Sequence, residues 1–439
     1  MLYYSTNKNT KEVTLKDAVV KGLANDKGLF MPERIDKFNA QFFKNIHKLS
    51  FREIAFEVAR KFFGEDIPEN SLRNIVNDTL SFDCPLIKVK NNIYSLELFH
   101  GPTLAFKDVG ARFMARLLNF FQNENESRVN VLVATSGDTG SAVANGFYKV
   151  DRIHVYVLYP KGKVSKIQES QFTTLGNNIT SVEIDGTFDD CQRLVKTAFL
   201  DPELKGKMSL TSANSINVAR LLPQAFYYFN AYARLVEQIS MAGKDLVISV
   251  PSGNFGNLTA GLIAGEMGLP VSQFIAANNS NDVVYEYLHT GNYNPRSSIE
   301  TIANAMDVGD PSNFVRIMDL YDQSYEKISS VIKGFRYSDD QIRATIKKVY
   351  NKTGYLCDPH GACGYQALED FMDDNDVGIF LETAHPAKFT ETVESIIGKG
   401  KVDMPSRLAE FMKGKKQSIN LKVDYQGFKD FLLSSVISV

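Results

Sequence analysis

Lys107 is the residue with the clearest potential for covalent chemistry. It lies in His-Gly-Pro-Thr-Leu-Ala-Phe-Lys-Asp, residues 100–108, after a Gly-Pro turn and just before a segment with helical spacing. A nucleophilic lysine needs a lowered pKa, which burial and a helix N-terminus can supply. Phe99, Leu104 and Phe106 are the apolar neighbours that would bury it. Taken alone, Lys107 is more typical of a surface lysine whose stem covers an aromatic ring, so the other motifs must decide.

A glycine-containing loop at residues 251–257, Pro-Ser-Gly-Asn-Phe-Gly-Asn, is a candidate phosphate site. It joins an apolar run at 246–250 to a helical segment at 258–266, so its backbone N–H groups would converge at a helix start. Neither Gly-x-x-x-x-Gly-Lys-[Ser/Thr] nor Gly-x-Gly-x-x-Gly occurs in it, which argues against a nucleotide triphosphate or a dinucleotide. A purely structural strand-to-helix turn is the alternative.

A second loop, Thr-Ser-Gly-Asp-Thr-Gly at residues 135–140, suits a carboxylate. It follows the valine-rich run 129–134, and open α/β sheets bind ligands at the carboxyl ends of their strands. Small hydroxyl residues and exposed amides would be the donors, with Asp138 the one competing charge. Asp138 could equally be an ordinary helix N-cap.

Asn214, Asn217 and Arg220 form a third polar group. They follow one another at helical spacing after Ser212-Ala213, so they could present one polar face to a ligand. A solvated helix face is the alternative.

Thr383 comes directly after the apolar run that ends at Leu381, within Thr-Ala-His-Pro-Ala-Lys, residues 383–388. A hydroxyl at the end of a buried strand is well placed to contact a ligand ring, although it could also cap the next helix. Two other segments are weaker candidates. Asp358-Pro-His-Gly361 reads as a helix start whose His360 is structural, and the acidic run 373–376 lacks the spacing of a calcium loop.

Buried strands and helices alternate from about residue 95 onward. Strands hydrophobic throughout, separated by helices, predict parallel sheets covered on both faces. We expect strands at 129–134, 153–158, 179–184, 246–250, 273–277 and 377–381, and helices at 141–147, 189–199 and 258–266. Short amphipathic helices, including 14–23 and 51–63, fill the first 90 residues, and 285–345 is polar, loop-rich and helical.

The composition limits the class of protein. The chain has 439 residues, a net charge of −2 and four cysteines without metal-ligand pairing. No basic block suggests nucleic-acid binding, and no apolar run approaches the ~20 residues of a membrane span. The N-terminus lacks the pattern of a secretory signal. We therefore expect a cytoplasmic protein with reduced thiols, no metal site, and no nucleic-acid or membrane partner.

Together, the candidate residues have the properties needed to hold pyridoxal 5′-phosphate and an amino acid. A lysine would bind the cofactor covalently, an amide-lined loop would take its phosphate, and a second loop would take a carboxylate.

Six motifs in order resemble the longer branch of the threonine synthase family, over nearly the whole chain. They are His-Gly-Pro-Thr-x-x-Phe-Lys-Asp at 100–108, Thr-Ser-Gly-Asp-Thr-Gly at 135–140, Ser-Ala-Asn-Ser-Ile-Asn at 212–217, Val-Pro-Ser-Gly-Asn-Phe-Gly-Asn at 250–257, Asn-Ala-Met-Asp-Val at 304–308 and Thr-Ala-His-Pro-Ala-Lys-Phe at 383–389. The resemblance implies a tryptophan-synthase-β-like fold type II enzyme, with two open parallel-sheet α/β domains and an N-terminal helical region. We expect boundaries of 1–92, 93–240 and 241–439.

The resemblance also implies roles for individual residues. Lys107 would bind the cofactor and shuttle protons, and Thr383 would contact the pyridine nitrogen. The cofactor phosphate would lie in the loop formed by Gly253, Asn254, Phe255, Gly256 and Asn257, where some family members carry Asp at the last position. The substrate carboxylate would meet Thr135, Ser136, Asp138 and Thr139, and the substrate phosphate would meet Asn214, Ser215, Asn217 and Arg220.

The implied reaction converts O-phospho-L-homoserine and water to L-threonine and phosphate. Separately, we expect a monomer. Three alternatives remain. One is a phospho-lyase acting on a phosphorylated hydroxy-amino acid, and another is a relative of the same fold that performs β-replacement or deamination. The third is a cofactor-free binding protein descended from such an enzyme.

Overall fold

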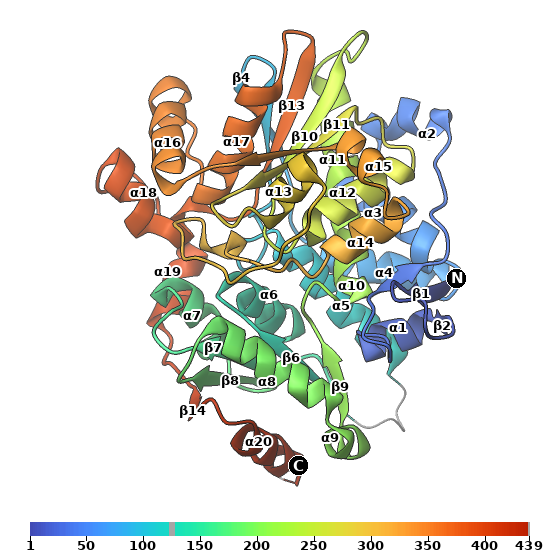
Figure 1. Ribbon diagram of the computed structural model, residues 1–439, viewed down its shortest axis with the longest axis vertical. Helices are drawn as coiled ribbons and strands as arrows, with labels where there is room; N and C mark the ends of the chain where they lie inside the picture. Colours follow the sequence, from blue (N-terminus) through green and yellow to red (C-terminus); the bar gives the residue numbers. More distant parts are fainter. Residues whose placement is uncertain (123–127, 438–439) are drawn as a thin grey trace. The chain divides into compact units, whose positions relative to one another are not determined.

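The computed structural model describes residues 1–122 and 128–437, in which two large β-sheets and a small three-stranded sheet organise the chain. Met1, Met31–Phe106 and Leu221–Asp403 form one unit, while Leu2–Phe30, Lys107–Arg220 and Met404–Val439 form another. We call them the six-stranded unit and the five-stranded unit after their sheets (Figure 1). This division differs from the three consecutive segments expected, because the chain passes from one unit to the other several times.

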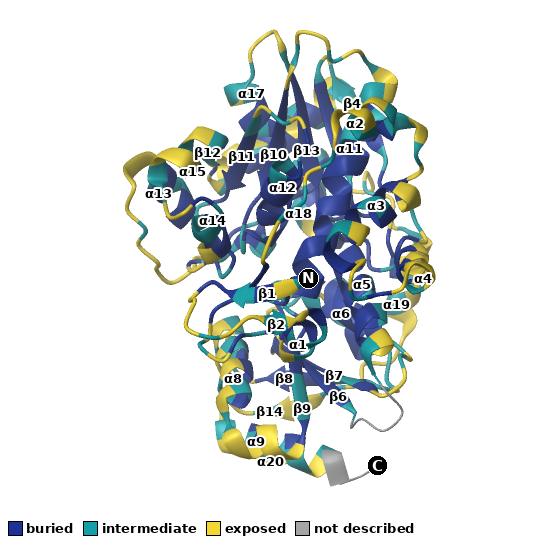
Figure 2. Cartoon of the chain, turned by 90° about the vertical axis from the view of Figure 1, so that its right-hand side faces the viewer, coloured by how far each residue is buried: buried dark blue, intermediate teal, exposed yellow. Residues whose placement is uncertain are grey.

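The six-stranded sheet has the order β12-β11-β10-β13-β5-β4. Its neighbouring strands are parallel except β4 and β5, which form an antiparallel pair with a register shift between Lys88 and Lys90. The strands are β4 (Leu86–Lys90), β5 (Ile93–Glu97), β10 (Asp245–Pro251), β11 (Gln273–Asn278), β12 (Ile332–Arg336) and β13 (Asp376–Glu382). Their central members are almost wholly buried, as Figure 2 shows for β10, β11 and β13.

Helices cover this sheet and account for most of the unit. α17 packs on β10, β11 and β13, while α11 packs on α3 and α12 (Figure 1). The helices are α2 (Ala40–Asn45), η1 (Ile46–Lys48), α3 (Phe51–Phe63), α4 (Glu69–Thr79), η2 (Leu222–Gln224), α11 (Ala225–Gln238), α12 (Gly256–Glu266), α13 (Val283–Thr290), η3 (Asn304–Met306), α14 (Phe314–Leu320), α15 (Tyr325–Val331), α16 (Asp339–Thr353), α17 (Pro359–Phe371), η4 (Pro386–Phe389) and α18 (Thr390–Ile397).

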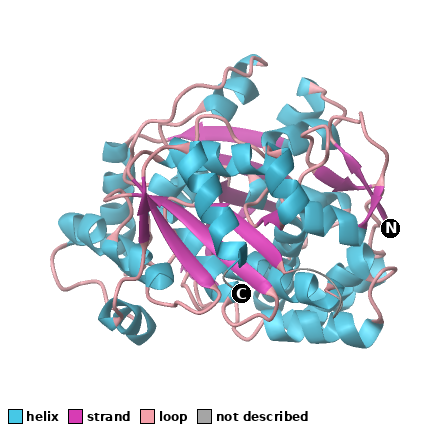
Figure 3. Ribbon diagram, turned by 90° about the horizontal axis from the view of Figure 1, so that it is seen from below, coloured by secondary structure: helices cyan, strands magenta, loops and turns pink. Residues whose placement is uncertain are grey.

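The five-stranded sheet is parallel throughout, in the order β14-β8-β7-β6-β9. Its strands are β6 (Val129–Ala134), β7 (Ile153–Pro160), β8 (Ile179–Ile184), β9 (Ser209–Ser212) and β14 (Ile419–Leu421). α6 and α8 both pack on β6 and β7, and every residue of β6 is buried, so both faces of that strand are covered. Figure 3 shows the strands of the chain lying among its helices.

The other elements of the five-stranded unit are helices and the strands β1 (Leu2–Ser5) and β2 (Val13–Thr14), which are antiparallel. They belong to the small three-stranded sheet, whose order is β2-β1-β3. The helices are α1 (Leu15–Lys21), α5 (Lys107–Phe121), α6 (Asp138–Phe147), α7 (Lys166–Thr173), α8 (Phe188–Leu200), α9 (Pro202–Lys207), α19 (Ser406–Lys413) and α20 (Tyr425–Ile437). β3 (Phe30–Pro32) and α10 (Val218–Leu221) each include a residue where the chain changes unit.

Local sequence explains where the clearest helices begin and end. α3 starts with a capping box in which Ser50 and Glu53 each accept a hydrogen bond from the other's backbone N–H. α1 is capped by Thr14 and ends at Gly22, whose φ of 67° is left-handed. These signals are local, and the expected helices at 14–23 and 51–63 are confirmed.

The strands expected at 129–134 and 179–184 are confirmed with the same bounds. The segment 285–345, expected to be polar, loop-rich and helical, also contains the edge strand β12. Its sequence, Ile-Lys-Gly-Phe-Arg, lacks the continuous apolar pattern by which the other strands were predicted. Among the residues that the structure describes, no helix has the length and apolar character needed to cross a membrane.

Candidate active site

The loop after β10 has the geometry of an anion site in the six-stranded unit. α12 begins at Gly256, and its N-cap residue Phe255 has a φ of 60°. This left-handed conformation is uncommon for a residue with a side chain, and it turns the chain sharply into the helix. The first backbone N–H groups of a helix lack intrahelical acceptors and carry the positive end of its dipole, so this turn can bind a phosphate.

Gly253 is packed so closely that no side chain fits at its position. A Cβ atom there would lie 2.6 Å from Met306 Cα and 2.9 Å from the Ala305 carbonyl oxygen. The loop is also held at Asn254, whose Oδ1 accepts a hydrogen bond from the Ser312 N–H at 2.6 Å. The phosphate loop is therefore supported by the turn η3 on one side and by residue 312 on another.

Asn257 provides the observation that fits a bound anion. Its Nδ2 is buried and has no hydrogen-bond acceptor among the described residues. The Tyr228 hydroxyl contacts Asn257 Oδ1 at 2.9 Å and the Asn257 carbonyl at 2.8 Å, which fixes the side chain. A buried donor without an acceptor costs free energy, and a ligand that supplied an acceptor at the N-terminus of α12 would remove this cost. The residues present therefore fit the phosphate of pyridoxal phosphate.

Thr383 lies where the sequence places it, just after the end of β13, and is 7% exposed. Its carbonyl accepts a hydrogen bond from the Phe106 N–H at 2.9 Å, and Ala105 pairs with Ala384 in an antiparallel bridge. The His385 N–H likewise donates to the Leu104 carbonyl at 3.1 Å. The segment before Lys107 is thus bound to the segment that carries Thr383.

Lys107 is the first residue of α5 and is partly buried. It immediately follows Phe106, the residue hydrogen-bonded to Thr383. The helix therefore includes Lys107, whereas the sequence suggested that it begins just after this residue. A lysine at the first position of a helix lies where the helix dipole disfavours its positive charge.

In the five-stranded unit, Thr135 organises the loop expected to meet a carboxylate. Its Oγ1 accepts hydrogen bonds from the N–H groups of Gly137 at 2.9 Å and Gly140 at 2.8 Å. Gly137 has a φ of 144°, and a Cβ there would lie 2.6 to 2.7 Å from the Gln168 side-chain amide. Ser136 and Thr139 remain partly exposed and are the residues of this loop most accessible to a ligand.

Asp138 is the first residue of α6, and the N-cap is Gly137. Its Oδ1 accepts a hydrogen bond from Gln168 Nε2 at 2.9 Å, and the side chain is buried. The interpretation of Asp138 as an ordinary N-cap is therefore wrong, since the carboxylate binds a neighbouring helix instead.

Asn214 connects the third polar group to the Thr135 loop. Its Nδ2 donates to the carbonyl of Ala134, the last residue of β6, at 3.1 Å. β6 and β9 are parallel neighbours, so the loops that follow them emerge at the same edge of the sheet. The structure thus brings Asn214 and the Thr135 loop together.

Asn217 and Arg220 are buried deeper than a solvated helix face would allow. Asn217 is fully buried, and its Nδ2 donates to the carbonyls of Val19 at 2.9 Å and Ser212 at 3.1 Å. Arg220 is 3% exposed, and its Nη1 donates to the Ala213 carbonyl. Asn217 is therefore better placed to hold the loop than to meet a ligand.

Sequence reasoning missed several residues beside these groups. Gln168 and Tyr228 lie in ordinary amphipathic helices, and nothing in the sequence marks them. Glu382 follows the apolar run of β13, and burial together with the Asp358 carboxylate raises its pKa well above the usual range. A charged residue type at the end of an apolar, buried strand is the one signal that could have identified Glu382.

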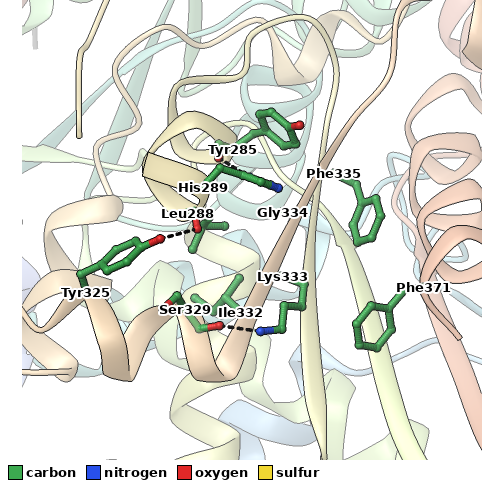
Figure 4. Close-up of a pocket in the computed structure, with 10 residues that line it drawn as sticks. All are labelled: Tyr285, Leu288, His289, Tyr325, Ser329, Ile332, Lys333, Gly334, Phe335 and Phe371. Carbon is green, nitrogen blue, oxygen red and sulfur yellow. Dashed lines mark hydrogen bonds between the residues drawn. The ribbon is translucent and has the colours of Figure 1, made fainter. Parts of the chain in front are cut away.

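A hollow of about 440 Å³ elsewhere in the six-stranded unit contains none of the expected site residues (Figure 4). It lies against edge strand β12, and its lining includes Tyr285, His289 and Lys333. Lys333 Nζ donates to the Ser329 carbonyl at 2.8 Å, so its charge is already partly engaged.

Comparisons with known proteins agree on one family. The family model for pyridoxal-phosphate dependent enzymes matches residues 80–381, that for the threonine synthase N terminus matches residues 2–80, and that for the threonine synthase C-terminal region matches residues 361–432. Threonine synthase of Buchnera aphidicola subsp. Acyrthosiphon pisum is 44% identical over 434 residues, covering 99% of this chain and 100% of the relative.

Solved structures give the same result. The crystal structure of threonine synthase from Escherichia coli has a TM-score of 0.92 and 42% identity, covering 99% of this chain and 100% of that chain. PLP-bound threonine synthase from Brucella melitensis has a TM-score of 0.91 and 34% identity, covering 99% of each chain. Both confirm the expected fold type II architecture, and the second supports pyridoxal phosphate as the cofactor. The chain belongs to the threonine synthase family of pyridoxal-phosphate-dependent enzymes.

Proposed function

We propose that the protein converts O-phospho-L-homoserine and water to L-threonine and phosphate, with Lys107 as the residue that binds the cofactor and moves protons. The observation that carries the proposal is the phosphate loop, where buried Asn257 Nδ2 lacks an acceptor beside the N-terminus of α12. The second support is the pairing of Phe106 with Thr383, since Phe106 directly precedes Lys107.

The cofactor would be held at three places. Gly253, Asn254, Phe255, Gly256 and Asn257 would bind its phosphate, Thr383 would meet its pyridine nitrogen, and Lys107 would bind it covalently. A threonine hydroxyl at the ring nitrogen carries no charge, unlike an aspartate, and so leaves that nitrogen unprotonated. Bound pyridoxal phosphate supplies the electron sink that makes substrate C–H bonds acidic.

Lys107 Nζ is the group that would carry protons. As a free neutral amine, Lys107 Nζ would remove the proton from the substrate α carbon and assist proton transfer at the β carbon. Phosphate would leave the γ carbon, water would supply the hydroxyl at the β carbon, and protons would be returned to the γ and α carbons. A lysine at a helix N-terminus is favoured in its neutral form, which is the form that accepts a proton.

The substrate's two anionic groups would be bound in the five-stranded unit. Ser136 and Thr139 would donate to its carboxylate, within the loop that Thr135 shapes. Asn214, Ser215 and Arg220 are the candidates for its phosphate, with Asn217 holding their loop in place. A site with donors for both groups favours a substrate that carries both.

The test is an assay of two products with the Lys107→Ala and Lys107→Arg variants as a matched pair. With O-phospho-L-homoserine, we expect the wild type to release threonine and phosphate in equal amounts. Both variants should be inactive, because arginine keeps the charge but cannot replace the nucleophile. Phosphate released with 2-oxobutyrate in place of threonine would indicate a phospho-lyase, and activity in either variant would exclude Lys107 as the essential group.

We further propose that the protein is a cytoplasmic monomer. All four cysteines are buried and none of them forms a disulfide, as expected in a reducing compartment. Sedimentation equilibrium of the holoenzyme tests the assembly state, and a mass twice that of the chain would contradict it.

A further inference from the structure

Three side chains that the proposed chemistry does not use form a buried cluster in the six-stranded unit. Asp358 and Glu382 are 0% exposed, and His360 is 2% exposed. Glu382 is the last residue of β13, immediately before Thr383, while Asp358 caps α17 and His360 lies in its first turn. Buried ionisable groups need partners, so their contacts show what they hold.

The hydrogen bonds define the protonation of His360. Its Nε2 accepts from the backbone N–H of Ala305 at 3.1 Å, and its Nδ1 lies 2.6 Å from Asp358 Oδ2. A backbone N–H can only donate, so Nε2 must be unprotonated and Nδ1 must carry the proton that Asp358 accepts. His360 therefore bridges the start of α17 and the turn η3 as a neutral ring.

Ala305 connects this bridge to the phosphate loop. His360 binds the Ala305 N–H, and the carbonyl of the same residue and Met306 Cα form the surface on which Gly253 packs, with the Gly253 Cβ position 2.6 Å from Met306 Cα. Gly253 has no side chain that could keep this contact if the turn η3 moved. A shift of η3 would therefore change the position of Gly253 directly.

The same cluster reaches the Thr383 end of the site through Glu382. The Asp358 backbone N–H donates to Glu382 Oε1, and Asp358 Oδ1 accepts from the Gly361 N–H at 2.6 Å. A Cβ at Gly361 would overlap the Glu382 carboxyl group, so the glycine is required for this approach. Asp358 thus links β13, which leads into Thr383, with the imidazole ring of His360, which supports η3.

We propose that Asp358, His360 and Glu382 are positioning residues that hold the phosphate loop and the Thr383 strand end at a fixed separation. His360 fixes the position of the phosphate loop, and Glu382 fixes the end of β13 that leads into Thr383. The proposal rests on the proposed cofactor roles of Gly253 and Thr383. It assigns a function to the Asp-Pro-His-Gly segment, which in sequence is only a helix start.

The experiment compares His360→Leu with His360→Gln. Leucine removes the acceptor for the Ala305 N–H at similar volume, whereas the glutamine side-chain oxygen can restore it. Pyridoxal phosphate is titrated into each apoenzyme, followed by visible absorbance and by the circular dichroism of the bound cofactor. We expect about tenfold weaker binding and an altered dichroism in His360→Leu, with substantial recovery in His360→Gln.

Thr345→Val is the matched control for a general loss of stability. Thr345 is 4% exposed on α16, and its hydroxyl donates one hydrogen bond to Gln366 at 3.1 Å. The Thr345→Val variant should have a lower melting temperature as apoenzyme, while its cofactor affinity and dichroism stay at wild-type values. If His360→Leu behaves in the same way, the cluster is only structural and the inference is overturned.

A Gly253→Ala variant separates this inference from the proposed function. If Gly253→Ala weakens cofactor binding and His360→Leu does not, the phosphate loop stands and the positioning role fails. If Gly253→Ala retains wild-type affinity, the assignment of the phosphate loop itself is wrong, and the positioning role fails with it.

Discussion

Replacing Asn217 with alanine tests whether this residue binds substrate or holds its loop. Asn217 makes three hydrogen bonds inside the five-stranded unit. Its Nδ2 donates to the Val19 and Ser212 carbonyls at 2.9 and 3.1 Å, and its Oδ1 accepts from the Ala219 N–H at 3.0 Å. At about 1 kcal/mol for each buried hydrogen bond, Asn217→Ala should lower the free energy of unfolding by about 3 kcal/mol.

Asn214→Ala is the matched comparison in the same loop. Asn214 is only partly buried, and its side chain donates one hydrogen bond, to the Ala134 carbonyl at 3.1 Å. Its loss should cost about 1 kcal/mol of stability. If Asn214 contacts the substrate phosphate, its variant should raise KM for O-phospho-L-homoserine more than Asn217→Ala does.

Urea unfolding followed by circular dichroism measures the first quantity, and steady-state kinetics at saturating cofactor measures the second. The reasoning is refuted if Asn217→Ala unfolds at the wild-type urea concentration with an unchanged slope but shows a raised KM. That result would make Asn217 a substrate ligand, as the family resemblance implies, and its three internal hydrogen bonds energetically unimportant.

The other predictions concern two ionisable groups in the six-stranded unit. Burial, with His100 adding to it, lowers the pKa of His385 to about 4, and its Nδ1 accepts from the Ala387 N–H at 3.1 Å. The unfolded chain binds this proton below about pH 6.5, so stability should fall by up to about 3 kcal/mol as the pH drops from about 6.5 to about 4. His385→Asn should reduce the dependence of the free energy of unfolding on pH in this range, and an unchanged dependence would contradict the prediction. The opposite sign holds for Glu382, whose pKa is raised by burial and by Asp358. The unfolded chain ionises it above about pH 4.3, so wild-type stability should decline relative to Glu382→Gln as the pH rises from there, and parallel curves would contradict this.

Sequence patterns predicted the strands and the chemistry-bearing loops because both signals are local. Val129–Ala134 is apolar at every position except Asn130, a pattern typical of a strand covered on both faces, and it forms β6 with the expected bounds. Lys107, the loop at 253–257 and Thr383 were all marked by the turn and strand residues next to them. Their roles as ligands remain predictions.

The division of the chain could not be predicted, because it depends on contacts between distant segments. β4 and β5 join the sheet of β10 and β13, while residues 404–439 add β14 to the edge of the five-stranded sheet. Strand order follows from which apolar faces meet in space, and no local pattern records that choice.

The sequence by itself determined the types of group available to the site: one lysine at a helix start, an amide-lined loop and a hydroxyl after a buried strand. Only the tertiary structure decided how each group is held. The sequence suggests that Asn217 binds a ligand, but its side chain makes hydrogen bonds within the protein. The sequence suggests no site role for His360, but this residue supports the turn on which Gly253 packs. The physical reason is that hydrogen-bond partners are set by spatial proximity, and His360 meets Ala305 across 55 residues of chain.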